Sequence, residues 1–426
     1  MWYQKIIQVF KIAELRNKII FVLGVFAVFR LMANIPVPGM NVENLRKFFE
    51  QFQMFGLLNI FTGGALDKFS IAMLGLGPYI TAVIILQLLT MIFPQLEKIY
   101  KEEGEAGRRK FNQYGRMLTV PLAMVQSYAM LMLFQKQNVI HPLDYLTLFS
   151  SILTITTGTL LLMWLGELIS EKGIGNGVSL LIFAGIVADI PSNIRQVIIT
   201  WEDSSQILNY LIFFIMSLII ITAVVIITEG RRNIPVSYAK RVRGMRMYGG
   251  VSTYLPLNVN PAGVIPIIFA LSVLLFPGMI SSFLTSVGGP VSNVAQRITV
   301  FLNEPWVHNI SYFILIVLFT YFYTAVTFDP KAIANNLQKM GGYIPGIRPG
   351  EPTIHFLYYI LNRILLIGAL FLGFIAITPS IVGSFTGIHV FRFLIGGTSL
   401  LIVVNVVLET MKQINAQLQM RDYETF

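Results

Sequence analysis

The sequence predicts an all-α polytopic membrane protein that crosses a lipid bilayer about ten times. Of its 426 residues, 55% are hydrophobic and only 12% are charged, whereas an ordinary soluble domain has roughly 25% charged residues. A soluble fold of this composition could not cover its surface with polar groups, but the outer face of a membrane protein contacts lipid. The chain has no cysteine, which excludes disulfides, thiolate chemistry and cysteine-bearing metal sites.

Ten apolar stretches follow one another along the chain, and each predicts a membrane-spanning helix. They are 19–33, 69–93, 117–135, 145–166, 178–199, 207–228, 262–284, 310–328, 354–378 and 388–408. About 20 apolar residues in a helix cover the hydrocarbon core of a bilayer. The first stretch carries Arg30 near its end, and the favourable transfer of its apolar residues outweighs the cost of that charge.

The basic residues lie mainly in alternate loops. The amino-terminal tail, the even-numbered loops and the carboxyl-terminal tail hold 22 of the 31 lysines and arginines, whereas the odd-numbered loops hold six. The positive-inside rule therefore predicts that both termini lie in the cytoplasm. The same rule accounts for the net charge of +10 without a nucleic-acid partner.

Two of the predicted spans are interrupted. The stretch 69–93 contains Gly75-Leu76-Gly77-Pro78, and the stretch 178–199 is apolar only to residue 188, before Asp189 and Pro191. Interrupted hydrophobic segments in a many-span protein indicate helices that line a cavity or site. A kinked helix buried among its neighbours is the alternative, and this feature alone leaves both open.

Five motifs spread along the chain carry a family resemblance. They are SIAMLGLGPYITA at 70–82, EEGEAGRRK at 102–110, MWLGE at 163–167 followed by GIGNG at 173–177, YIPGIRPG at 343–350 and GGTSLLI at 396–402. With these motifs the chain resembles the SecY/Sec61α family of protein-conducting channels, and in particular its bacterial members. The motifs are long and keep their order, so a chance match is very improbable.

The resemblance implies two inverted, pseudo-symmetric five-helix halves around a central pore, residues 1–200 and 201–426. It implies the central channel subunit of the Sec protein translocase in the bacterial inner membrane, with no enzymatic activity, cofactor or metal. Such a channel passes unfolded secretory polypeptides across the membrane and releases transmembrane segments sideways into lipid. The implied partners are SecE, SecG, the SecA ATPase, the ribosome, signal sequences, nascent chains and membrane lipid, with ribosomal RNA as the one nucleic acid contacted.

An apolar ring is expected to close the pore. By resemblance it consists of Leu76, Ile80, Val178, Ile182, Ile268 and Ile402. Positions 76 and 80, and likewise 178 and 182, are four residues apart and share a helix face. An apolar constriction dewets and so blocks ions. Six ordinary core aliphatics are the alternative, and Leu76 and Val178 depart from the isoleucine that the family favours.

A plug that stoppers the pore from the outer side is implied at 55–66. Its residues are Phe55, Gly56, Leu57, Leu58, Asn59, Ile60, Phe61, Thr62, Gly63, Gly64, Ala65 and Leu66. The segment is too short to span a membrane, and the glycines at its ends allow it to hinge. A re-entrant structural loop is the competing interpretation.

Polar residues in three spans and basic residues in two cytoplasmic loops complete the predicted sites. Gln87, Gln126 and Ser272 fall on helices that the family uses as a lateral gate, although static interhelical contacts would also explain them. The loops at about 229–260 and 329–353 are expected to dock the ribosome or SecA. Their candidate residues are Arg231, Arg232, Lys240, Arg241, Arg243, Arg246, Lys339 and Arg348, of which Arg348 is the strongest.

A secondary transporter of a small solute is the main alternative, because broken helices and inverted repeats occur there too. Coupled transport usually needs charges inside the membrane, whereas Glu167, Asp329 and Glu409 lie at span ends. An intramembrane serine protease has little support, since Gly397-Thr398-Ser399-Leu400 with His389 is too short a pattern to be specific. The predicted mechanism is therefore passive conduction of polypeptide.

Overall fold

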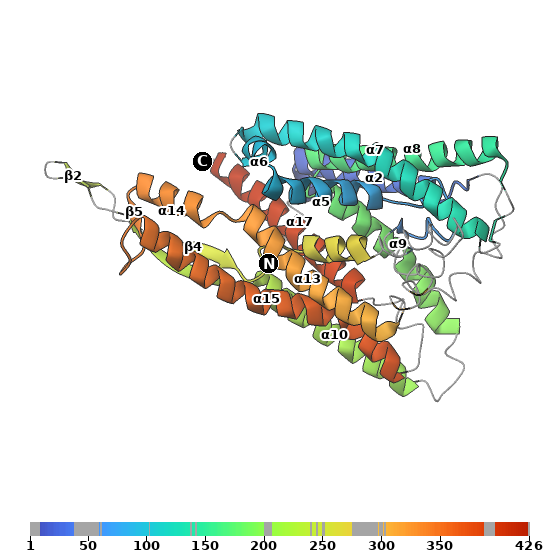
Figure 1. The fold of residues 1–426 in the computed structure, drawn as a ribbon. Coiled ribbons are helices and arrows are strands. Elements are labelled where there is room, and N and C mark those ends of the chain that lie inside the picture. The colour runs from blue at the N-terminus through green and yellow to red at the C-terminus, as the bar shows by residue number, and fades with distance from the viewer. Residues whose placement is uncertain are drawn as a thin grey trace.

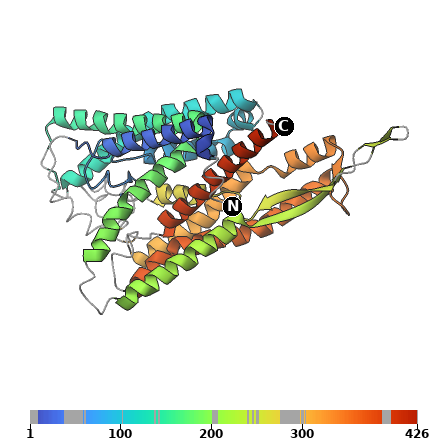
Figure 2. The same cartoon turned by 180° about the vertical axis from the view of Figure 1, so that it is seen from behind.

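The computed structural model of the chain describes residues 9–37, 59, 62–101, 103–136, 139–140, 143–199, 207–238, 241–243, 246–248, 252–274, 297, 301, 304–386 and 397–424. Most of these residues are helical. Figures 1 and 2 show α2, α5, α7 and α8 gathered along one side of the molecule and α10, α13 and α15 along the other. Helix α9 of the first group and helix α17 of the second lie where the two groups meet, and the strands extend from one end (Figure 1).

The helices of the first group come from the first part of the chain. They are α2 (Ala13–Met32), α5 (Gly77–Ile92), α6 (Pro94–Lys101), α7 (Gly104–Lys136), α8 (Tyr145–Lys172) and α9 (Gly177–Ile199). Helix α5 starts where the sequence predicts an interruption, because Pro78 in its first turn lacks a backbone N–H and pre-sets the helical φ angle. Helix α9, in contrast, continues through Asp189 and Pro191, so the second interruption is a change of polarity and not a break.

The remaining helices come from the second part of the chain. They are α10 (Ile207–Glu229), a helix at Ile265–Leu274, α13 (Pro305–Thr327), α14 (Pro330–Lys339), α15 (Glu351–Thr386) and α17 (Gly397–Glu424). Each of the ten predicted apolar stretches therefore contains a helix. Four described helices are long and apolar enough to cross a membrane, or five if α5 and α6, which are bent by 111° at their junction, form one span. The count of ten crossings stays a prediction.

Two small sheets interrupt the helices, and the all-α prediction missed them. Strand β1 (Arg231–Tyr238) pairs antiparallel with β4 (Ser252–Asn258) and β5 (Gly342–Tyr343), and β2 (Arg241–Arg243) pairs with β3 (Arg246–Tyr248). Ile234 and Val236 alternate with exposed residues along β1 and are buried in a cluster with side chains of α14 and α15. The predicted loop 229–260 is thus largely a β-hairpin held against the start of α15.

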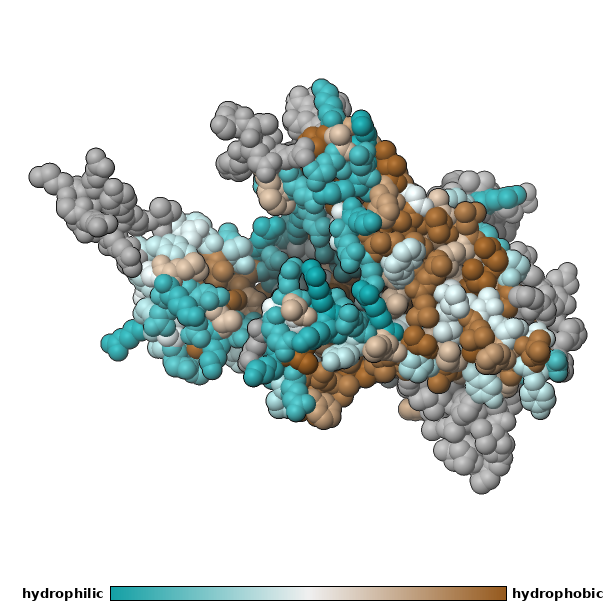
Figure 3. Space-filling model, turned by 90° about the horizontal axis from the view of Figure 1, so that it is seen from above, coloured by the Kyte–Doolittle hydropathy of each residue, from teal (hydrophilic) through white to brown (hydrophobic). Residues whose placement is uncertain are grey.

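One large apolar cluster joins the two groups of helices. It contains buried side chains of α2, α8 and α9 from the first group, and of α10, α13, α15 and α17 from the second. Helix Ile265–Leu274 contributes several fully buried residues, among them Ile267 and Ala270. Figure 3 shows hydrophobic residues over a broad area of the outer face and hydrophilic residues gathered toward the end that carries the strands. That separation is expected of a protein that lies partly in lipid.

A close backbone approach at Gly158, in the first group of helices, gives a stability prediction. A Cβ atom added at Gly158 of α8 would stand 2.0 Å from the carbonyl oxygen of Ile71, so Gly158→Ala must push the segment before α5 away from α8. We expect the free energy of unfolding to fall by about 1–3 kcal/mol. Thermal unfolding of the purified protein, followed by tryptophan fluorescence, measures the loss as a lower unfolding temperature.

Gly115→Ala is the matched control, because a Cβ there would make only ordinary contacts of 3.7 Å with Leu86 and 3.9 Å with Val83. In a helix interior alanine is also favoured over glycine, so this variant should unfold at or slightly above the wild-type temperature. Equal unfolding temperatures for the two variants would show that α8 and residue 71 are not packed as described.

Candidate pore, plug and gate

The six aliphatic residues predicted to close the pore lie in the same apolar cluster. Leu76, Ile182, Ile268 and Ile402 are buried, with exposed fractions of 0–8%, and Ile80 and Val178 are partly buried against them. They come from four separate parts of the chain: the start of α5, the start of α9, helix Ile265–Leu274 and α17. The six residues thus belong to one apolar cluster to which these four elements contribute, and their arrangement as a ring stays a prediction.

Local hydrogen bonds fix the two helix starts that carry the paired ring residues. The backbone N–H of Ile80 donates to the carbonyl of Leu76 at 3.0 Å, which places the two side chains one turn apart. On α9 the side-chain oxygen of Asn176 accepts from the N–H of Val178 at 3.1 Å and of Ser179 at 3.3 Å. This cap satisfies donors that would otherwise be unpaired at the helix start.

The GIGNG motif makes a tight turn between α8 and α9. A Cβ at Gly177 would stand 1.8 Å from the carbonyl oxygen of Gly166, so only glycine allows the helices to cross this closely. The backbone N–H of Gly177 donates a hydrogen bond to the hydroxyl oxygen of Ser170 at 2.9 Å. The turn therefore sets where the Val178 and Ile182 face of α9 points.

Part of the predicted plug lies outside the described residues, namely Phe55, Gly56, Leu57, Leu58, Ile60 and Phe61. The described part consists of Asn59 and 62–66, which continue into turns that reach α5. The side-chain amide of Asn59 donates to the carboxylate of Asp67 and accepts from the backbone N–H of the same residue. The backbone carbonyl of Asn59 accepts from the N–H of Gly64 at 3.0 Å. We call residues 62–70 the plug base. Asn59 closes it into a compact loop.

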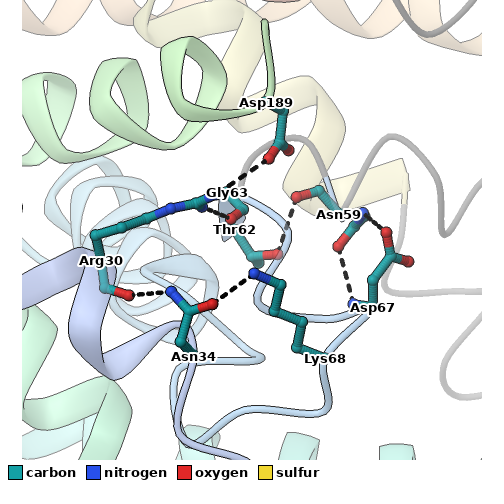
Figure 4. A network of polar contacts seen from close by, with 8 residues as sticks. All are labelled: Arg30, Asn34, Asn59, Thr62, Gly63, Asp67, Lys68 and Asp189. Carbon is teal, nitrogen blue, oxygen red and sulfur yellow. Dashed lines mark hydrogen bonds and ion pairs between the residues drawn. The ribbon is translucent and has the colours of Figure 1, made fainter. Parts of the chain in front are cut away.

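Backbone hydrogen bonds tie the plug base to the end of the first span. The N–H of Val37 donates to the carbonyl of Phe69 at 2.8 Å, and the N–H of Ile71 donates to the carbonyl of Ile35 at 3.0 Å. The ammonium group of Lys68 also donates to the side-chain oxygen of Asn34, and the side-chain amide of Asn34 donates to the backbone carbonyl of Arg30 (Figure 4). The base of the plug is therefore anchored on α2 and the residues that follow it.

The glycine pair of the plug base rests on α9. Gly63 and Gly64 have φ angles of +66° and +73°, which side-chain-bearing residues rarely adopt. A Cβ at Gly63 would stand 2.8 Å from the Cα of Gly185, and one at Gly64 would stand 3.2 Å from an oxygen of Asp189. Arg30 reaches the same place from α2: it donates to the carbonyl of Gly63 and lies 3.9 Å from Asp189 (Figure 4).

Of the three candidate gate residues, Ser272 makes a hydrogen bond within its own helix. Its hydroxyl donates to the carbonyl of Ile268 at 3.0 Å, within the same helix. Gln126 on α7 is buried, and Gln87 on α5 has a buried Oε1 atom without a partner among the described residues. Their role in a gate stays a prediction.

The candidate docking residues lie at the polar end of the molecule. Arg231 and Arg232 are exposed on β1, and Lys339 and Arg348 are exposed at the end of α14 and in the turn before α15. Arg241, Arg243 and Arg246 fall on the backbone of β2 and β3, and Lys240 lies outside the described residues. Sequence reasoning noted Arg30 and Asp189 separately but missed their pairing, although a charge inside a span signals a partner.

Comparison with known proteins gives one family. The sequence profile of the SecY family matches residues 70–411. A relative from Streptomyces coelicolor, named protein translocase subunit SecY, is 42% identical over 431 residues, which cover 98% of each chain.

Two solved structures resemble the fold across most of both chains. One describes how the plug domain of a SecY protein stabilises the closed state of the translocation channel and maintains a membrane seal; it has a TM-score of 0.63 at 22% identity. The other is Sec61 in a canine ribosome–channel complex from the endoplasmic reticulum, with a TM-score of 0.66 at 20% identity. Each match covers 93% of this chain and 91% of the solved one.

The contact of Gly63 and Gly64 with α9 can be tested by a substitution at Gly63. We expect Gly63→Ala to destabilise the plug base by about 1–3 kcal/mol, because alanine is strained at a positive φ angle and its Cβ would meet the backbone of Gly185. Faster amide hydrogen exchange across residues 62–70, measured by mass spectrometry, would report the loss.

Gly24→Ala on α2 is the control, since a Cβ there has nothing within 4 Å. Its exchange across residues 62–70 should match that of the wild type. Unchanged exchange in Gly63→Ala would mean that the plug base does not rest on α9.

Proposed function

Because the chain belongs to the SecY family, we propose that it is the central channel subunit of a Sec protein translocase. It passes unfolded secretory polypeptides across the membrane and releases transmembrane segments sideways into lipid. The observation that carries this proposal is that six aliphatic residues from four separate elements belong to one apolar cluster, four of them buried and two partly buried. The chain is a channel subunit and not an enzyme by itself. The family match favours this function over that of a solute transporter.

The proposed arrangement has ten crossings in two inverted halves, 1–200 and 201–426, with both termini in the cytoplasm of a bacterium. A helix in each of the ten apolar stretches supports it, as do the two helix groups seen in Figures 1 and 2. The distribution of lysine and arginine supports the orientation. The pore lies between the halves.

The aliphatic ring acts as a seal that does not bind its cargo. Side chains such as Ile182 and Ile402 offer no hydrogen-bonding group, so water leaves the constriction and ions cannot follow. A passing polypeptide likewise finds no polar partner that would hold it. To admit a chain, the ring must widen, which costs the apolar contacts between α5, α9, α17 and helix Ile265–Leu274.

The entry of a signal sequence or membrane span offsets the free-energy cost of widening the ring. It enters at a seam whose two sides are the spans at 69–93 and 117–135 and the spans at 262–284 and 310–328. Gln87, Gln126 and Ser272 lie along that seam, and the polar contacts of such residues across membrane helices contribute only about 0.6 kcal/mol on average. The plug, 55–66, then moves away from the outer side of the pore. The chain passes through the ring or leaves sideways into lipid.

The driving force comes from a partner, which we propose to be the ribosome or SecA with ATP. The two basic loops are the docking surface: Arg231 and Arg232 on the β-hairpin, and Lys339 and Arg348 around the start of α15, are all exposed. The similar Sec61 structure belongs to a ribosome–channel complex, which supports the ribosome as one partner. SecE as a clamp around the halves, together with SecG, completes the proposed assembly.

Cysteine crosslinking tests the pore. Since the chain has no cysteine of its own, single cysteines at 76, 80, 178, 182, 268 and 402 can each be reacted with a secretory precursor arrested during transport. We expect crosslinks at these six positions, because an extended chain inside the ring contacts all of its members. Gel electrophoresis of the crosslinked products measures the yield.

Leu218→Cys on α10 and Ile367→Cys on α15 are the controls, since both side chains are more than half exposed and neither helix borders the proposed gate. They should crosslink poorly to the precursor. A pattern in which these controls react while none of the ring positions does would place the polypeptide path elsewhere.

Charge reversal tests the docking surface. Arg348→Glu should weaken binding of the ribosome or of SecA about tenfold, because an arginine at the centre of an interface commonly contributes 1 kcal/mol or more. Sedimentation of the reconstituted channel with each partner measures the affinity. Lys18→Gln, on an i,i+4 pair with Glu14 at the start of α2, should bind normally; equal affinities for the two variants would remove Arg348 from the docking surface.

A further inference from the structure

An arginine of the first span and an aspartate of the fifth meet at the glycine pair of the plug base. Arg30 donates a hydrogen bond to the carbonyl oxygen of Gly63, and its guanidinium lies 3.9 Å from the carboxylate of Asp189 (Figure 4). We propose that Arg30 and Asp189 form a latch that holds the plug base on α9 in the resting channel. This inference rests on the proposed function of 55–66 as a plug.

Both residues are charged where charge is costly. Arg30 lies on α2 and Asp189 on α9, each within a predicted membrane span, and ionisable residues in such spans are rare and commonly functional. Arginine inside a span usually reaches for water at the membrane surface. Here its side chain, which is 37% exposed, is directed at a backbone carbonyl of the plug base, and Asp189 provides the opposite charge that favours this direction.

The latch lies on the same face of α9 as the pore ring. Val178, Ile182, Gly185 and Asp189 follow at intervals of four, three and four residues, the spacing of one helix stripe. Seven residues of helix separate the second ring residue from Asp189, a rise of about 10 Å. The plug base is therefore fastened beside the polypeptide path, about two turns beyond the ring.

Glycine makes this contact possible. At Gly63 the backbone of the plug base approaches the backbone of Gly185, and at Gly64 it approaches the carboxylate of Asp189, in both cases closer than a Cβ would comfortably allow. The carbonyl of Gly63 is thereby brought within reach of Arg30. A hydrogen bond from a charged donor to a backbone carbonyl is among the stronger ones in proteins.

Arg30, Gly63 and Asp189 all belong to the first 200 residues, so the latch does not join the two proposed halves. Separating the halves at the lateral gate leaves it intact. The latch therefore controls a separate step, the release of the plug, and Asp189 acts as a positioning residue because it orients Arg30 toward the carbonyl of Gly63.

The test measures the ion leak of the resting channel. The chain is reconstituted with SecE and SecG in planar bilayers in potassium chloride, without precursor, as wild type, Arg30→Gln, Asp189→Asn and the double variant. Arg30→Gln should raise the leak about tenfold, since it removes a charged hydrogen-bond donor. Asp189→Asn should raise it about two- to fivefold, as expected for a partly exposed ion pair, and the double variant should leak no more than Arg30→Gln alone.

Two further variants and a second measurement keep the result decisive. Lys412→Gln breaks another interhelical ion pair, the 2.8 Å contact of Lys412 with Glu229, and should leave the leak at the wild-type level. Arg30→Lys keeps the charge and should leak less than Arg30→Gln, which separates loss of the latch from misfolding. Amide exchange across residues 62–70 should rise in step with the leak.

Deletion of 55–66 separates the latch from the plug itself. If the deletion raises the ion leak but Arg30→Gln does not, the latch proposal is wrong and the plug proposal is supported. If neither changes the leak, both are wrong. If the effects of Arg30→Gln and Asp189→Asn multiply in the double variant, the residues act independently, and the positioning role of Asp189 is overturned.

Discussion

The packing of aliphatic side chains in one cluster between the two helix groups is the interaction on which the rest of the structure depends. Inside a bilayer, helices gain little from hiding apolar surface, because lipid is as apolar as leucine. The helices are held together instead by van der Waals contacts between closely packed side chains. Ile182, Ile267 and Leu401, for example, are packed with almost no exposed surface. The same cluster contains the residues of the proposed ring, so the contact that stabilises the closed state is also the contact that a passing chain must open.

Close backbone approaches arrange the elements around that cluster. Gly158 lets the segment before α5 lie on α8, Gly177 lets α8 cross α9, and Gly63 lets the plug base lie on α9. Each contact fixes an element of the first group that bears on the pore. The charged side chains of Arg30 and Asp189 are tolerated at this place because they face each other and a backbone carbonyl. Two residues of the proposed ring and the contact of the plug base thus lie on neighbouring parts of one helix, α9.

The sequence predicted the apolar stretches and the interruption at 75–78, where α5 begins, because each of these leaves a local pattern of hydrophobicity or a proline. The six candidate ring residues came from the family resemblance. The sequence did not predict the sheet of β1, β4 and β5: the basic and glycine-rich character of 229–260 resembled a loop, and only the alternation at Ile234 and Val236 indicated a strand. The pairing of Arg30 with Asp189 was equally hidden, since residues far apart in the chain meet there through tertiary packing alone.

The most direct measurement is protease protection of an unfolded precursor added to vesicles that contain this chain with SecE and SecG. If the chain conducts polypeptide passively through an aliphatic ring, the precursor becomes protected only when SecA and ATP are both supplied, and a tightly folded domain placed within it stalls the transport. Protection without a motor, or ion-driven uptake of a small solute by vesicles that never protect the precursor, would contradict this account.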